Sequence, residues 1–270
     1  MALIQVNFVS SSLFRTVPIQ VILPVDKLPF PGRENKLPDT FKTLYLLHGL
    51  LGNYTDWVSG TRIQRWAEER NLAVVMPSGD NAFYLDRGAG NEYTRFIGEE
   101  LVNITRRMFP LSSKREDTFI AGLSMGGYGA VRCGLKYHET FSHIAGLSSA
   151  LHLFEGPEPP HPGSISNESF GFLPREKAIK SDQNPRVLAE RLAKEKSELP
   201  RIYLACGTED GLLAANRVYR DLFTENGYDL TWYEGPGGHE WDFWDSQILR
   251  VLHWLPLEYA GQGVNSGNVK

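Results

Sequence analysis

Cysteine is scarce in this chain, whose 270 residues include only Cys133 and Cys206. Two cysteines cannot build the disulfide framework that holds small secreted domains together. Both residues lie in apolar sequence of the kind that forms helices and strands. We therefore expect two buried free thiols and a reducing, cytoplasmic location.

Long apolar runs and clusters of basic charge are also missing. The longest apolar stretches fall well short of the ~20 residues that a membrane-spanning helix needs. Residues 1–24 alternate apolar and polar positions like strands, and they lack the charged and apolar regions of a secretory signal. The formal charge is −4 and no Lys/Arg-rich run stands out. These absences predict a protein without a nucleic-acid or membrane partner.

The usual signals for cofactors are absent as well. We find no zinc-spaced cluster of histidine and cysteine, and no phosphate-cradling glycine loop followed by lysine. Asp80, Asp86 and Glu92 are scattered carboxylates, for which a solvated role is a better explanation than a cation site. The sequence therefore predicts no metal and no organic cofactor.

Predicted strands alternate with predicted helices along most of the chain. Residues 6–9 and 17–23 predict an antiparallel pair of strands at the N-terminus, and a proline-rich loop follows. Later strands are expected at 43–47, 73–76, 118–121, 142–148, 200–206 and 230–234, and helices at 63–70, 96–108, 127–135, 212–222 and 247–255. This alternation predicts an α/β fold with a mostly parallel twisted sheet and helices on both faces. We expect residues 1–260 to form one domain.

Two segments depart from this alternation. Residues 151–198 separate two strands, and their first part is dense in proline, so we expect a small cap-like insertion there. Its apolar residues Phe170, Phe172 and Leu173 could line an acyl or alcohol pocket or could pack onto the body of the protein. Residues 261–270 are polar and are expected to form a flexible C-terminal tail.

The most informative stretch is Gly122-Leu123-Ser124-Met125-Gly126, which has the pattern G-x-S-x-G. A short apolar run precedes it, and small apolar residues at helical spacing follow it. A strand, a sharp turn and a helix are what a nucleophile elbow requires, with small residues two positions either side of the serine. Ser124 is therefore the candidate nucleophile. The alternative interpretation is a serine that only caps the following helix.

A second glycine motif, His48-Gly49-Leu50-Leu51-Gly52, follows a predicted buried strand. Attack by a serine on a carbonyl group builds negative charge on the carbonyl oxygen, which two backbone N–H groups must stabilise. We expect one donor from Met125, the residue after the nucleophile. We assign the second to Leu50, with Leu51 as the alternative. A turn without a function is the remaining interpretation.

The acid and the base should follow the serine in the order Asp or Glu, then His. Asp210 comes just after the strand at 200–206, where its carboxylate could orient a histidine. Glu209 is the nearest rival, and a helix cap is the structural alternative for Asp210. His239 lies in a glycine- and proline-rich loop after the last predicted strand and is the candidate base. His143 is expected to be a surface or capping residue.

Together, the four motifs around His48, Ser124, Asp210 and His239 resemble the esterase D branch of the α/β-hydrolases, which includes tributyrin, acetyl-xylan and feruloyl esterases and S-formylglutathione hydrolases. The resemblance runs from about residue 1 to about 258 and is closest to the small bacterial tributyrin esterases. It implies an α/β-hydrolase fold and a carboxylesterase with Ser124, Asp210 and His239 as its triad. It also implies Leu50 and Met125 as oxyanion donors and, because such bacterial esterases are commonly oligomeric, a homodimer or homotetramer.

The resemblance implies a short-chain acyl ester as the small-molecule substrate, cleaved through an acyl-enzyme. Acetylated xylan-type sugars and hydroxycinnamoyl esters are alternatives, and the tryptophans near His239 could either pack or stack on such groups. The sequence His48-Gly49-Leu50 departs from the Ser-Gly-Leu usual in S-formylglutathione hydrolases, which weighs against that activity. An acyltransferase on the same scaffold and a non-catalytic binding module are further alternatives.

Overall fold

The computed structural model describes residues 1–28, 37–154 and 171–264. In these segments eight strands form one sheet in the order β1-β2-β4-β3-β5-β6-β7-β8. The strands are β1 (Ala2–Ser10), β2 (Arg15–Leu23), β3 (Lys42–Leu47), β4 (Leu72–Pro77), β5 (Thr118–Leu123), β6 (His143–Leu147), β7 (Arg201–Gly207) and β8 (Leu230–Gly235). The β1–β2 and β2–β4 pairs are antiparallel and all other pairs are parallel. The predicted mostly parallel sheet with an antiparallel N-terminal pair is confirmed.

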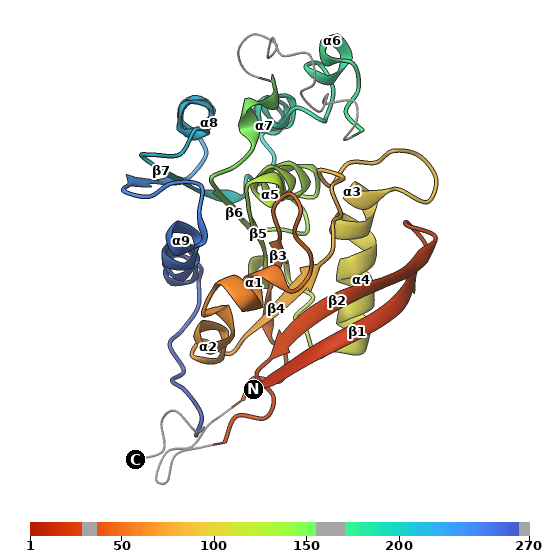
Figure 1. Ribbon diagram of the computed structural model, residues 1–270, viewed down its shortest axis with the longest axis vertical. Coiled ribbons are helices and arrows are strands. Elements are labelled where there is room, and N and C mark those ends of the chain that lie inside the picture. The colour runs from red at the N-terminus through yellow and green to blue at the C-terminus, as the bar shows by residue number, and fades with distance from the viewer. Residues whose placement is uncertain (29–36, 155–170, 265–270) are drawn as a thin grey trace.

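Helices cover both faces of the sheet (Figure 1). The longer ones are α2 (Ile63–Glu68), α4 (Leu101–Met108), α5 (Met125–Lys136), α7 (Pro185–Glu195), α8 (Leu213–Glu225) and α9 (Trp241–Trp254), and the shorter ones are α1 (Asp56–Gly60), α3 (Tyr93–Arg95) and α6 (Arg175–Ala178). Side chains of β3 alternate between two cores. Tyr45 and Leu47 pack with α4, α5, α7 and α8, whereas Leu44 and Leu46 pack with α1, α2 and α9. This two-residue period is that of a strand buried on both faces, and the arrangement is the α/β-hydrolase fold.

One helix differs from its prediction. The helix expected over 96–108 begins earlier, at α3, and passes through a π-helical segment at Phe96–Glu100 before continuing as α4. Apolar periodicity cannot reveal one wider turn, because the buried residues Phe96, Ile97 and Leu101 satisfy either spacing.

The described part of the expected cap-like insertion contains a short 3₁₀ turn at Leu151–Phe154, then α6 and α7. Helix α7 belongs to the helix layer over the sheet, because Leu188, Ala189 and Leu192 are buried in the same core as α5 and α8. Figure 1 shows α6 farther from the sheet than α7, at the top of the molecule.

Phe172 packs onto the body of the protein. Its ring is buried, with centroids 5.2 Å from Phe83 and 5.7 Å from Tyr128. Leu173 is 42% exposed, and Phe170 lies outside the described residues. Within the expected tail, the N–H of Val264 donates to the carbonyl oxygen of Leu28, and residues 265–270 lie outside the described part.

Strand β5 passes into α5 through one residue, Ser124, whose φ is 53°. A non-glycine residue in this left-handed region carries backbone strain. A Cβ atom added to Gly122 would overlap the backbone of Gly126, and one added to Gly126 would overlap the carbonyl oxygens of Leu47 and His48. Glycine at both positions therefore lets β5, α5 and the end of β3 meet at the turn.

We expect Gly126→Ala to lower the free energy of unfolding by about 2 kcal/mol, because the added methyl group would overlap backbone atoms that cannot move aside. Gly211→Ala is the matched control, since a Cβ atom there meets nothing within 4 Å. Urea denaturation of both variants measures the difference. Equal unfolding midpoints for the two variants would contradict the packing argument.

The turn between β1 and β2 is tied to the helix layer by one carboxylate. Glu100, the last residue of the π-helical segment, accepts hydrogen bonds from Ser10 Oγ (2.7 Å) and from the N–H groups of Ser11 (2.6 Å) and Ser12 (3.0 Å). Partial burial acts to raise the pKa of Glu100, but these hydrogen bonds outweigh it and lower the pKa to about 2. The ionised carboxylate thus holds the turn.

We expect Glu100→Gln to reduce stability at pH 7 by about 1 kcal/mol, a modest value because solvent screens this partly exposed group. Since the folded pKa lies below the ordinary value of 4.5, the stabilisation by Glu100 is complete above that pH and is lost as the pH falls toward 2. The difference in the free energy of unfolding between wild type and Glu100→Gln should therefore become smaller as the pH falls. Denaturation midpoints measured from neutral to acidic pH test this, and a constant gap would contradict it.

Candidate active site

Three loops at the carboxyl edge of the parallel sheet bring together Ser124, Asp210 and His239, which follow β5, β7 and β8. His239 Nε2 lies 3.0 Å from Ser124 Oγ, and His239 Nδ1 lies 2.9 Å from Asp210 Oδ2. A carboxylate only accepts hydrogen bonds, so Nδ1 carries the proton of the neutral ring and Nε2 is free to accept one from the serine. The three predicted residues therefore form one continuous hydrogen-bonded chain.

The alternative role as a helix cap applies to Asp210 but not to Ser124. Ser124 stands at the N-cap of α5, but its side chain makes no capping hydrogen bond and contacts His239 instead. Asp210 does both jobs, because Oδ1 accepts the N–H of Leu212 (2.9 Å) at the start of α8 while Oδ2 contacts His239. The cap therefore helps to fix the carboxylate that orients the histidine.

Asp210 is buried, yet it is held in its ionised form. Burial acts to raise the pKa of Asp210, but hydrogen bonds from His239, the Leu212 N–H and Ser148 outweigh it and lower the pKa below its ordinary value. The rival Glu209 is exposed and turned elsewhere, because its Oε2 accepts the N–H of Gly237 at 2.6 Å. Glu209 thus braces the loop that carries His239.

Tryptophans support the histidine from the side of α9. The rings of Trp244 and His239 are perpendicular, with centroids 4.9 Å apart and planes at 89°. Trp244 Nε1 donates to Ser148 Oγ at 3.1 Å. Trp241 contacts Trp244 at 5.2 Å and Trp57 at 5.7 Å, again edge to face. Of the two roles left open for these tryptophans, Trp244 has the packing role. Sequence reasoning did not identify Ser148 as a partner of Asp210 and Trp244.

The loop after β3 lies beside the nucleophile turn. The N–H of Leu51 donates to Asn81 Oδ1 (2.8 Å), so it is already engaged, whereas the N–H of Leu50 donates to no group in the described part of the chain. Met125 is the first residue of α5, where N–H groups lack partners within the helix. Of the two candidates for the second oxyanion donor, Leu50 rather than Leu51 thus has an N–H without a partner in the described residues.

His48 holds this loop rather than acting as a base. It is buried, its Nε2 accepts the N–H of Gly79 (2.8 Å), and its Nδ1 donates to the carbonyl oxygen of Gly49 (2.7 Å). Burial lowers the pKa of His48, which keeps the ring neutral at physiological pH. Both ring nitrogens are thus hydrogen-bonded to backbone groups.

The expectation for His143 was wrong. This residue opens β6 and is buried, with its ring 5.3 Å from Phe119 and 5.0 Å from Trp254. Burial lowers its pKa to about 4. The strand predicted at 142–148 includes His143, but the sequence does not show what covers this end of the strand, because the neighbouring aromatic rings come from distant segments.

The described residues contain no group of three or more His, Cys, Asp or Glu side chains placed to hold a metal ion. Asp80 instead contacts Arg15 (2.6 Å), Glu92 contacts Arg95 (3.1 Å), and Asp86 accepts N–H groups at the start of α3. Within the same residues, no helix has the length and apolar character to cross a bilayer.

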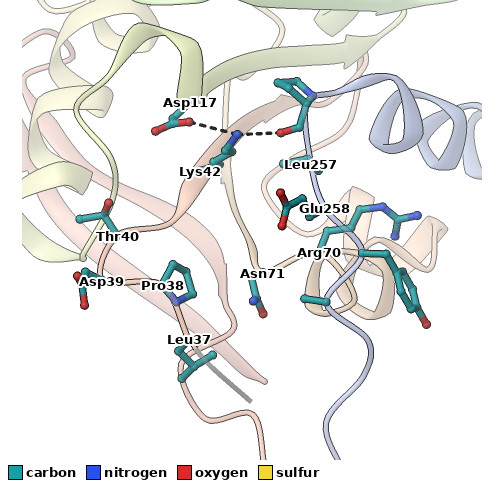
Figure 2. A pocket seen from close by; sticks show the side chains of 13 residues that line it. Leu37, Pro38, Asp39, Thr40, Lys42, Arg70, Asn71, Asp117, Leu257 and Glu258 are labelled. Carbon is teal, nitrogen blue, oxygen red and sulfur yellow. Dashed lines mark hydrogen bonds and ion pairs between the residues drawn. The ribbon is translucent and has the colours of Figure 1, made fainter. Parts of the chain in front are cut away.

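A groove of about 600 Å³ lies at the opposite, amino end of the parallel strands, lined by residues 37–40, 42 and 256–260 among others (Figure 2). Inside it Lys42 Nζ donates to the carbonyl oxygen of Pro256 (2.8 Å) and pairs with Asp117 (3.4 Å). This lysine therefore links the chain after α9 to the start of the sheet. None of the predicted site residues lines the groove.

Comparison with known proteins agrees with this geometry. Residues 10–255 match the model of a family described as putative esterase. An acetyl esterase of Caldicellulosiruptor saccharolyticus is 42% identical over 261 residues, which cover 94% of this chain and 98% of that protein. The family expectation drawn from the sequence motifs is therefore confirmed.

Two solved structures are similar over 94% of this chain and 98% of their own. They are the fluorophosphonate-binding serine hydrolase F of Staphylococcus aureus, with a TM-score of 0.81 and 31% identity, and an S-formylglutathione hydrolase of the same organism, with a TM-score of 0.78 and 30% identity. The chain belongs to the putative esterase family and is a carboxylesterase with the α/β-hydrolase fold.

Proposed function

We propose that this carboxylesterase hydrolyses short-chain acyl esters with Ser124, His239 and Asp210 as its catalytic triad. The observation that carries the proposal is the unbroken chain of contacts, 3.0 Å from serine to histidine and 2.9 Å from histidine to aspartate. The strained backbone of Ser124 adds support, because strain of this kind persists where a turn must present a reactive group.

The proposed reaction proceeds in two steps. His239 takes the proton of Ser124 as Oγ attacks the ester carbonyl, and the N–H groups of Leu50 and Met125 stabilise the oxyanion. The alcohol leaves with a proton from His239, and a water molecule activated by the same ring then hydrolyses the acyl-enzyme. Asp210 remains ionised throughout, holds the Nδ1–H tautomer and stabilises the imidazolium.

The preference for short acyl chains draws its support from the acetyl esterase relative. The likeness to an S-formylglutathione hydrolase makes the thioester S-formylglutathione the second candidate substrate. Acetylated xylan, feruloyl esters and acyl transfer to a sugar hydroxyl remain alternatives of the same scaffold. A purely binding role has no support in a site where all three side chains are in contact.

We also propose a cytoplasmic homodimer or homotetramer. The support for a reducing compartment is that Cys133 and Cys206 are both buried and unpaired. Burial raises the pKa of each thiol to about 12, so neither is a reactive thiolate at physiological pH.

Ser124→Ala should lower kcat by about 10⁴-fold or more, and Asp210→Asn by roughly 10³–10⁴-fold, because an amide no longer stabilises the imidazolium. Glu209→Gln is the matched control, since the amide oxygen can still accept the N–H of Gly237. Steady-state hydrolysis of p-nitrophenyl acetate measures all three. A severe loss in the Glu209 variant with activity retained in Asp210→Asn would move the acid role to Glu209.

In a series of p-nitrophenyl esters from acetate to laurate, kcat/KM should be highest for the shortest acyl chains. Ser124→Ala should abolish this activity. Methyl ferulate, an acetylated xylan oligomer and S-formylglutathione are assayed beside the series. A maximum on any of these three would replace the short-chain proposal with that substrate class. Product analysis with an added alcohol acceptor separates hydrolysis from acyl transfer.

A further inference from the structure

Leu51 is held in a backbone conformation that leucine rarely adopts. Its φ is 66°, in the left-handed region, and its side chain is 84% exposed. Burial of the side chain therefore does not offset the backbone strain. The N–H of Leu51 donates instead to Asn81 Oδ1 at 2.8 Å, across from the loop that follows β4.

The same two loops are joined on the other side of Leu50. The N–H of Gly79 donates to His48 Nε2 at 2.8 Å, and the hydroxyl of Tyr84 donates to the carbonyl oxygen of His48 at 2.9 Å. Leu50, whose N–H is free within the described residues, thus lies between one anchor at His48 and another at Leu51. The direction of this N–H depends on both anchors and on the turn that the Gly52 N–H closes by donating to the carbonyl oxygen of Gly49 (3.3 Å).

The loop that carries Asn81 is itself firmly held. Asp80, just before it, accepts hydrogen bonds from Arg15 (2.6 Å) and from the Tyr93 hydroxyl (2.5 Å). The side chains of Phe83 and Tyr84, just after it, are buried. Asn81 is exposed but projects from a fixed segment, so its amide oxygen is a fixed acceptor for the strained loop.

We propose that Asn81 is a positioning residue for the oxyanion hole: by accepting the Leu51 N–H it keeps Leu51 in the left-handed region and aims the adjoining Leu50 N–H at the oxyanion. The inference rests on the proposed function, since it extends the role given to Leu50. Negative charge on the carbonyl oxygen develops in the transition state and is absent from the bound ester. Loss of the anchor therefore affects kcat much more than KM.

The first experiment is Asn81→Ala. We expect kcat on p-nitrophenyl acetate to fall about 10-fold or more, less than the roughly 10²–10³-fold cost of deleting an oxyanion donor outright, with KM within about 3-fold of wild type. Asn53→Ala is the matched control, because Asn53 is also an exposed asparagine near this loop, but within the described residues its side chain bonds only to Thr55, two residues on. Its kcat should stay close to that of wild type.

A double-mutant cycle tests the link through backbone strain. Glycine adopts a positive φ without strain, so Leu51→Gly removes the need for the anchor. The fall in kcat caused by Asn81→Ala should be at least about 3-fold smaller in the Leu51→Gly background than in wild type. A fall of the same size in both backgrounds would show that Asn81 does not act through Leu51.

A fluorophosphonate probe supplies a readout apart from ester turnover, because its phosphoryl oxygen occupies the oxyanion hole when Ser124 is modified. Labelling of Ser124, followed by intact mass, should be slower in Asn81→Ala than in wild type and unchanged in Asn53→Ala. If Asn81→Ala and wild type have equal labelling rates and equal kcat, the positioning role of Asn81 is overturned and the proposed function is unaffected. Wild-type protein that neither labels at Ser124 nor turns over esters would overturn the proposed function, and this inference with it.

Discussion

The site depends on the close approach of two backbone segments at the edge of the sheet. Gly126, the second residue of α5, lies against the carbonyl oxygens of Leu47 and His48 at the end of β3, and no side chain fits between them. This contact sets the nucleophile turn and the loop of His48 side by side. Because both segments are backbone, the distance between Ser124 and Leu50 follows from the fold and not from the rotamers of flexible side chains.

The features that follow from local backbone rules were predictable from the sequence. The G-x-S-x-G turn, the alternating strands and helices, and the placement of Asp210 and His239 after late strands all depend on neighbours in the chain. The sequence assigned the second oxyanion donor to Leu50 and kept Leu51 as the alternative. What distinguishes the two, a hydrogen bond donated by the Leu51 N–H to Asn81 Oδ1 thirty positions away, has no local signal. The only signal for Asn81 is its place after a buried parallel strand, which many residues share.

The buried His48 and the exposed His239 show how hydrogen-bond partners determine which histidine can act as a base. His48 has both nitrogens bonded to backbone groups, so it can neither accept nor release a proton without breaking the loop. His239 has one nitrogen on the carboxylate of Asp210 and the other on the hydroxyl of Ser124, a group that has a proton to give. In the sequence, the two histidines differ mainly in that His48 precedes Ser124 and His239 follows it. The misplaced His143 shows the limit of that reasoning, since its burial comes from contacts with Trp254 and Phe119.

The edge-to-face series of Trp57, Trp241 and Trp244 ends on His239, and this has an optical consequence. An imidazolium is a far better quencher of indole emission than a neutral imidazole, and the quenching requires near contact. The emission of Trp244 therefore depends on the protonation of His239. Among the six tryptophans of the chain, Trp244 is the one whose ring lies beside the candidate base.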